Sequence, residues 1–193
     1  MANVYGGVLV NGYGGSGTIT TALLSSGTID NRDRIGKLIY ISGDYQRWGN
    51  SNNGIFEVGD SVGLGTLQVG KFDETNVFVA AVSVNNTGAV DNYGSIGTAN
   101  VNGGQLWNKA HIETLNVNGN WAWNSNNARI VSMNLYSGGL SNHGNALIET
   151  ANINGGDLRN VDNARVGIAN VYGGTLNNGC DANFPGLPNA CSF

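Results

Sequence analysis

The chain has 193 residues, of which 40% are hydrophobic and 11% are charged, so it can bury a core and is not a disordered polypeptide. Its 31 glycines and 2 prolines favour many strands joined by tight turns, because the residues that form helices are scarce. The net charge of −4 and the scatter of the 9 basic residues argue against a nucleic acid or an anionic membrane as partner. No apolar run reaches the about 18 residues that span a bilayer, so we expect no membrane insertion.

A repeated motif runs along the whole chain. "ETANINGGDLRN" (149–160) is one copy, and "GTANVNGGQLWN" from Gly97 and "GIANVYGGTLNN" from Gly167 are two others. Each unit has an apolar anchor residue, with further apolar residues about five positions before and after it. In chain order the anchors are Val4, Leu24, Tyr40, Leu67, Val84, Val101, Val117, Leu135, Ile153 and Val171.

Within each unit, apolar and polar residues alternate and are interrupted by a Gly-Gly pair, which indicates short strands joined by sharp turns. Antiparallel hairpins would give no reason for identical residues to recur at a fixed period. Stacked coils do, because equivalent residues then form columns with a spacing of about 4.8 Å. The sequence therefore predicts an all-β fold over residues 1–178, a single-stranded parallel β-helix (β-solenoid) of about ten coils of 16–18 residues each. Such a rod would be roughly 45–50 Å long.

Asparagine recurs at two positions of the repeat. We expect each stacked amide to bond the amides above and below it in a structural ladder, with no catalytic role. One ladder lies two positions after the third apolar residue of each unit and includes Asn108, Asn124, Asn142, Asn160 and Asn178; the other precedes the anchors at Asn100, Asn116, Asn134, Asn152 and Asn170.

The unit that follows Tyr40 is about ten residues longer than the others. We expect residues 45–62, "YQRWGNSNNGIFEVGDSV", to form a loop that projects from one coil. Trp48 in this loop could stack on a sugar ring; the alternative is a loop that folds back to cover the side of the rod.

One outward position of the repeat carries residues that could bind a ligand. Asp73 and Asp91 occupy it in adjacent units, and two such carboxylates could serve a retaining glycosidase. Against that role, no Arg, Lys or His recurs beside them to tune a pKa. Trp107 and Trp123 occupy the same position in later adjacent units, so they should be neighbours on the outer surface. They form either a platform for a sugar or a partner, or an aromatic ladder that stabilises the sheet.

No cofactor or metal site is expected. Phosphate-binding, zinc-binding and calcium-binding motifs are absent, as is the motif of serine hydrolases. His111 and His143 fall at different places in the repeat, so they do not form a pair of metal ligands.

The two ends of the chain depart from the repeat. Residues 179–193 replace the next coil, and we expect them to form a cap, or the start of a connection to something else. Cys180 and Cys191 lie close together there, which suggests a local disulfide and hence an oxidising compartment, although two reduced thiols are the alternative. At the other end the motif begins midway through its strand, which suggests a longer precursor or a first coil that pairs with another molecule.

The pattern I-x-T-A-N-V-x-G-G-x-L-x-N resembles the passenger-domain repeats of bacterial self-associating autotransporter adhesins, and the resemblance covers most of residues 1–178. It implies a right-handed β-helix displayed outside the cell, at the bacterial surface, which mediates aggregation or adhesion through its lateral face and has no active site. The period also suits a left-handed triangular helix.

Three functions follow from these features. The first is a non-catalytic extracellular structural or adhesive β-solenoid, whose partner is another copy of itself, through lateral or end-to-end association, or a surface glycan or protein. The second is a carbohydrate-binding or polysaccharide-degrading β-helix that uses Trp48, Trp107 and Trp123. The third is an ice-binding solenoid, for which Thr21, Thr98, Thr114 and Thr150 occupy one repeat position, although other residue types interrupt the series.

Overall fold

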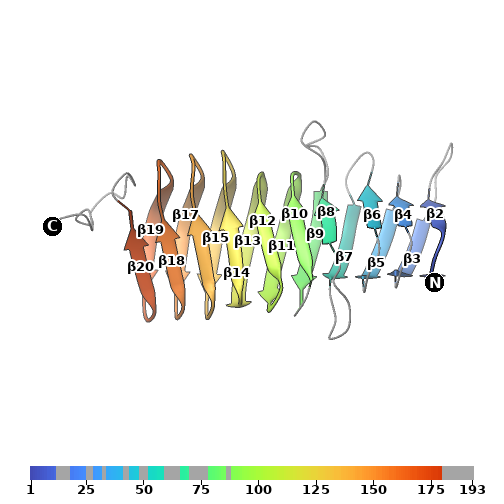
Figure 1. Cartoon of the computed structure of the whole chain (residues 1–193), viewed down its shortest axis with the longest axis horizontal. Helices are drawn as coiled ribbons and strands as arrows, with labels where there is room; N and C mark the ends of the chain where they lie inside the picture. The colour runs from blue at the N-terminus through green and yellow to red at the C-terminus, as the bar shows by residue number, and fades with distance from the viewer. Residues whose placement is uncertain are drawn as a thin grey trace.

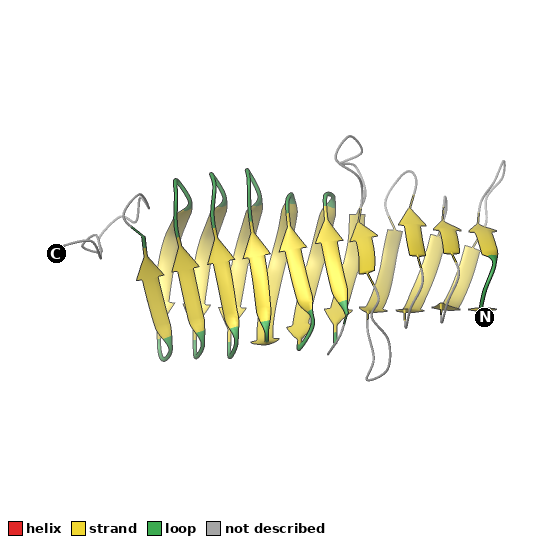
Figure 2. Ribbon diagram, viewed as in Figure 1, coloured by secondary structure: helices red, strands yellow, loops and turns green. Residues whose placement is uncertain are grey.

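The chain forms two parallel β-sheets that face each other along a rod, with strands β1 and β20 at opposite ends of the rod (Figure 1). The computed structural model describes residues 1–11, 18–24, 28–31, 34–40, 44–47, 52–58, 66–69, 78–85 and 88–179. Within these residues, all regular secondary structure is β-strand (Figure 2).

Odd-numbered strands form one sheet, called sheet A, and even-numbered strands form the other, called sheet B. The strands of sheet A are β1 (Ala2–Val4), β3 (Thr18–Leu24), β5 (Arg34–Tyr40), β7 (Asn52–Val58), β9 (Phe78–Val84), β11 (Ser95–Asn102), β13 (His111–Gly119), β15 (Arg129–Leu135), β17 (Leu147–Ile153) and β19 (Arg165–Val171). The strands of sheet B are β2 (Val8–Asn11), β4 (Thr28–Asn31), β6 (Asp44–Arg47), β8 (Thr66–Val69), β10 (Ala89–Asn92), β12 (Gln105–Asn108), β14 (Trp121–Asn124), β16 (Gly139–Asn142), β18 (Asp157–Asn160) and β20 (Thr175–Asn178).

Each turn of the solenoid contributes one strand to sheet A and the next strand to sheet B. The twelve strands from β9 to β20 therefore make six consecutive turns, and the earlier strands continue both sheets. Val101 pairs with Val117, 16 residues later, and Leu135 pairs with Ile153, 18 residues later. All strand pairs are parallel, as in β15 with β17 and β16 with β18. The predicted all-β parallel solenoid is confirmed; the handedness of the coil stays a prediction.

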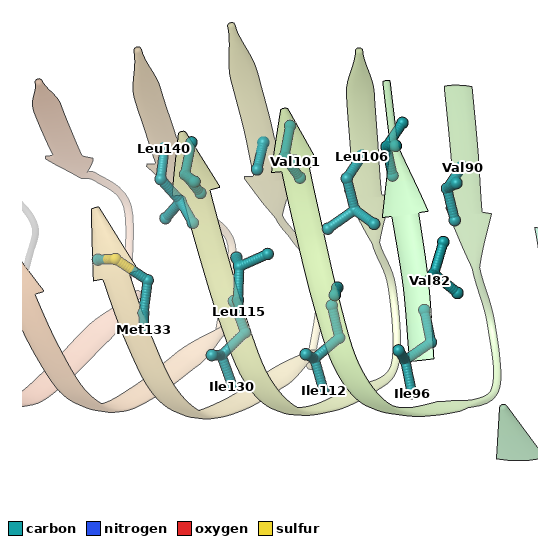
Figure 3. Packing of buried hydrophobic residues seen from close by; sticks show 14 of the residues in the cluster. Val82, Val90, Ile96, Val101, Leu106, Ile112, Leu115, Ile130, Met133 and Leu140 are labelled. Atoms are coloured by element: carbon teal, nitrogen blue, oxygen red, sulfur yellow. The ribbon is translucent and has the colours of Figure 1, made fainter. Parts of the chain in front are cut away.

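The core lies between the two sheets and is a stack of nearly identical layers (Figure 3). In one layer, Ile112, Leu115 and Val117 of β13 meet Ala122 of β14, and all four are 0% exposed. Strand β13 turns two successive residues outward between Ile112 and Leu115, which bends the strand so that it curves around the core. Ala122 occupies the third apolar position of its unit. It pairs with Leu106 on one side and Leu140 on the other, and all three are fully buried.

The turn from sheet A to sheet B is a pair of glycines in several coils. The second glycine of the pair adopts a positive φ, 76° in Gly156 and 71° in Gly174. A side chain rarely adopts this conformation, so the turn requires glycine for its backbone shape. In these two pairs the first glycine has no such φ, whereas in the pair 103–104 it is the first, Gly103, that has a positive φ of 149°. An added Cβ at Gly173 would lie 2.6 Å from the carbonyl oxygen of Asn154 in the preceding coil.

The predicted position of the long unit is wrong. Strand β7 and the last three residues of β6 lie inside residues 45–62, so this segment is not a single projecting loop. The register places Val58, not Leu67, in the anchor column between Tyr40 and Val84, while Leu67 pairs with Val90 in sheet B. Several apolar residues between 55 and 72 satisfy the anchor spacing, and the spacing alone did not select the right one. The extra residues lie between Val58 and Phe78, outside β8.

Candidate functional site

The fully buried polar side chains of the described coils form one column of asparagines. Each Nδ2 donates to the Oδ1 of the asparagine in the next coil, at 2.7–2.9 Å. The column contains Asn92, Asn108, Asn124, Asn142, Asn160 and Asn178, exposed by 0–3%. It matches the predicted ladder and extends it to Asn92.

Further hydrogen bonds fix this column to the backbone. Asn142 Nδ2 also donates to the carbonyl oxygen of Arg165 at 3.1 Å, and Asn92 Nδ2 donates to that of His111 at 3.0 Å. These carbonyls belong to the first residues of the sheet A strands β19 and β13, directly after the chain passes from sheet B back to sheet A. Burial of amides is tolerated here because both the donor and the acceptor of each side chain are used. The role of the column is thus structural.

A second column of asparagines lies on the outer face of sheet A. Asn116, Asn134, Asn152 and Asn170 each donate Nδ2 to Oδ1 of the preceding asparagine at 2.8–2.9 Å, beginning with Asn116 to Asn100. These side chains are only partly buried. The direction of donation is opposite to that in the buried column. The first direction runs without reversal from Asn92 to Asn178 and the second from Asn170 to Asn100, so this part of the rod has a chemical polarity along its axis.

The outer face of sheet B carries a cluster of aromatic side chains, which we call the aromatic surface and define as Trp107, Trp121 and Trp123. Trp107 and Trp123 pair in register and stack, with ring centroids 5.1 Å apart and an angle of 9° between the planes. The prediction that they are neighbours is confirmed. All three rings are half-exposed.

Trp121 was not among the predicted site residues. Its ring lies over the backbone of Gly139 in the next coil, since a Cβ there would be 2.7 Å from two ring carbons. The guanidinium of Arg159, one coil further on, lies 4.9 Å from the ring centroid, a cation–π distance. The alternation of Trp121, Ala122 and Trp123 was the available signal, because it places both tryptophans on the same face of a strand.

Lys109 links two residues of the preceding coil beside the aromatic surface. Its Nζ donates to Asp91 Oδ1 at 2.8 Å and to the hydroxyl of Tyr93 at 2.7 Å, and lies 4.4 Å from the centre of the Tyr93 ring. Partial burial lowers the pKa of Lys109, but the hydrogen bonds to Asp91 and Tyr93 and the attraction between the charges outweigh it. The pKa is raised above its ordinary value of 10.5.

The raised pKa predicts how the stability contribution of Lys109 changes with pH. Folding stabilises the charged ammonium, so this contribution is fully present below 10.5 and is lost as the pH rises through the raised value. We expect the free energy of unfolding of Lys109→Met to fall below that of the wild type at neutral pH, with a difference that shrinks in alkali. Urea denaturation across this range measures the difference. Arg165→Met removes an exposed basic residue of sheet A as a control, and a Lys109 difference independent of pH would contradict the assignment.

The predicted pair of carboxylates is wrong. The strand that pairs with β10 is β8, and its register places Gln68 on one side of Asp91 and Trp107 on the other. Gln68, and not a second carboxylate, thus neighbours Asp91 on that side, and Asp73 is outside the described residues. The expectation that no basic residue accompanies Asp91 is also wrong, because Lys109 binds it directly. Asp91 thus acts as an ion-pair partner on the surface.

Three other candidates lie outside the described residues: Trp48, Cys180 and Cys191. The sugar-stacking role of Trp48 and the disulfide stay predictions. In the described part of the chain, no group of three His, Cys, Asp or Glu side chains could hold a metal ion. That part of the chain also contains no helix long and apolar enough to cross a membrane.

The threonines considered for ice binding do lie in one column of sheet A. Thr98 pairs with Thr114, Thr114 with Ser132, and Ser132 with Thr150. The neighbouring coils carry other residue types in this column: Ala81 precedes Thr98, and Ile168 follows Thr150. The regular hydroxyl array therefore spans four coils.

Comparisons of the chain with protein-family models, with curated proteins and with solved structures gave no match. The fold defines the class of the protein as a parallel β-solenoid.

Proposed function

We propose that the chain is a non-catalytic adhesive β-solenoid that acts outside the cell, at a bacterial surface. Its partner is a second copy of the chain, or a glycan or protein on another surface. The repeat pattern that resembles autotransporter passenger domains supports this proposal, and in that family the coil is right-handed.

The observation that carries the proposal is the stacked pair Trp107 and Trp123 on the outer face of sheet B. Together with Trp121 it places three large, half-exposed indoles on one side of a rod whose interior is filled by buried side chains. Tryptophan is enriched at the centres of protein interfaces because it buries a large area with few rotatable bonds. A rigid sheet that displays such a surface favours binding to a partner over catalysis.

Sedimentation velocity over a concentration series tests the proposal. We expect reversible self-association that weakens about tenfold or more in Trp107→Ala plus Trp123→Ala, the loss typical of interface aromatics. Tyr136→Ala is the control, because Tyr136 is 52% exposed but lies in a turn of the rod. A monomer at every concentration that also binds no cell, glycan or matrix component would contradict the proposal.

Carbohydrate binding is the second candidate function. It is favoured by polar groups beside the aromatic surface. Arg159 lies over the ring of Trp121, and Asp91, which pairs in register with Trp107, forms an ion pair with Lys109. The stacked geometry limits it, because Trp107 and Trp123 cover one face of each other's ring and a sugar stacks on ring faces. A glycan array separates the two functions, since an adhesin that binds only its own copies would give no signal on it.

A further inference from the structure

The first and last described coils have nearly the same sequence. Residues 2–12 read ANVYGGVLVNG and residues 169–179 read ANVYGGTLNNG, which differ only at Val8/Thr175 and Val10/Asn177. The strand registers, followed coil by coil, place Ala2, Asn3 and Val4 in the columns that end with Ala169, Asn170 and Val171. In the last two coils Asn152 pairs with Asn170 and Ile153 with Val171, whereas in the first two coils Asn3 pairs with Leu23. The first coil therefore has the sequence expected of a coil that follows the last one.

The last coil exposes a side chain that the other coils bury. Val171 is 51% exposed, whereas Leu135 and Ile153, which occupy the same column, are 0% exposed. Leu176 is only partly buried, while Leu158 before it is fully buried. This end of the rod thus presents apolar surface along the edges of β19 and β20. An exposed strand edge with apolar side chains is a surface to which another strand can add.

Gly6 at the other end is not required by the conformation of its own chain. Its φ is not in the left-handed region, and a Cβ added to it would meet nothing within 4 Å. The equivalent Gly155 and Gly173 are each confined by a carbonyl oxygen of the preceding coil, that of Tyr136 and that of Asn154. A glycine at this position therefore avoids a clash with the preceding coil in these two coils, although Ser137 occupies the same position with a coil before it. Gly6 suits a coil stacked on a preceding one.

The columns also define the orientation in which two rods can join. Asn170 donates Nδ2 toward the N-terminal side of the rod, to Oδ1 of Asn152, and Asn116, Asn134 and Asn152 donate in the same direction. If the first coil of one copy follows the last coil of another, Asn3 can donate to Oδ1 of Asn170 in the same sense, and the strands stay parallel. Joining two like ends would reverse the strands and oppose identical ends of each column.

We propose that copies of the chain assemble head to tail, with the first coil of one copy (β1 and β2) stacked on the last coil of the next (β19 and β20). The inference rests on the proposed function, for which it specifies the mode of self-association. The interface is heterologous and leaves one free end on each copy, so it propagates into a filament. At each junction the filament joins the two hydrophobic cores and adds Asn3 of one copy to the column that ends at Asn170 of the other. Within a copy this column is interrupted by Leu23, Ile39, Glu57 and Ser83.

Gly6→Ala tests this interface in the full-length chain. The added methyl group would meet the carbonyl oxygen of Tyr172 in the neighbouring copy, as Gly173 shows for the preceding coil, but it has open space within its own copy. We expect unchanged thermal unfolding of the monomer and self-association weakened about tenfold or more in sedimentation velocity. Val8→Ala is the control, because it also truncates the first coil but acts on an outward side chain that is 70% exposed.

Cysteine cross-linking tests the same interface directly. Adjacent parallel strands are about 4.8 Å apart, which suits a disulfide between Asn3→Cys in one copy and Asn170→Cys in another. We expect a cross-linked dimer when the two variants are mixed, and markedly less of it when Asn100→Cys, in the same column but a central coil, replaces Asn170→Cys.

The outcomes separate this inference from the function on which it rests. Association that Gly6→Ala leaves unchanged but that the double tryptophan variant weakens would overturn head-to-tail stacking and leave lateral adhesion standing. A wild-type chain that is monomeric at every concentration would overturn the inference. One way to reach that result is that residues 180–193, and not a second copy, cover the last coil. In that case binding to cells or glycans decides whether the adhesive function survives.

Discussion

Asn124→Ala should destabilise the protein by about 2–5 kcal/mol, because it interrupts the buried column of asparagines at its centre. Asn124 Oδ1 accepts from Asn108, and its Nδ2 donates to Asn142 and, at 3.3 Å, to the carbonyl oxygen of Leu147. Alanine removes all three bonds. The partners remain fully buried, so the substitution costs the desolvation of polar groups as well as the bonds themselves.

Asn116→Ala is the matched control for this prediction. Asn116 also bonds the asparagine before it and the one after it, but its column is only partly buried on the outer face of sheet A. Water can replace the lost partners there, so the expected cost is about 0.5–1.5 kcal/mol. Urea denaturation of the two variants measures the difference. Equal losses would mean that burial does not set the strength of the ladder.

The sequence predicted the coils after Val84 well, because identical residues recur there at a fixed spacing. Leu140 and Leu158 pair as expected, and so do the buried asparagines Asn142 and Asn160. Column membership follows from spacing alone, since parallel coils place equivalent residues side by side. The stacked pair Trp107 and Trp123 was predicted for the same reason.

The sequence failed where spacing admitted more than one register. Both Val58 and Leu67 satisfy the apolar pattern after Tyr40, and only the pairing of β7 with β9 selects Val58. The expected pairing of Asp73 with Asp91 failed through the same error. Lys109 was missed for a different reason: it follows the end of β12, and its contact with Asp91 depends on how far a flexible side chain reaches. Contacts made by long side chains beyond a strand end are not encoded in the repeat period.

Gly156→Ala should destabilise the protein strongly, at about 2–5 kcal/mol. Two costs add: alanine at a φ of 76° is strained by about 1–2 kcal/mol, and its methyl group would lie far inside van der Waals contact of the Gly138 carbonyl oxygen in the preceding coil. Relief requires the two coils to move apart, which disturbs the close packing of the layers beneath the turn and adds about 1–3 kcal/mol.

Gly7→Ala separates these two costs, because Gly7 has the same φ of 76° and the same place in the repeat but nothing within 4 Å of an added Cβ. We expect it to lose only the about 1–2 kcal/mol of backbone strain when unfolding is measured on the monomer. At concentrations where filaments form, the same methyl group would face Gly174 of the neighbouring copy, as Gly174 itself faces Gly156. Under these conditions Gly7→Ala should therefore lower the apparent free energy of unfolding by more than it does in the monomer. Equal unfolding energies for the two variants under monomeric conditions would show that close approach between coils does not require glycine at this turn.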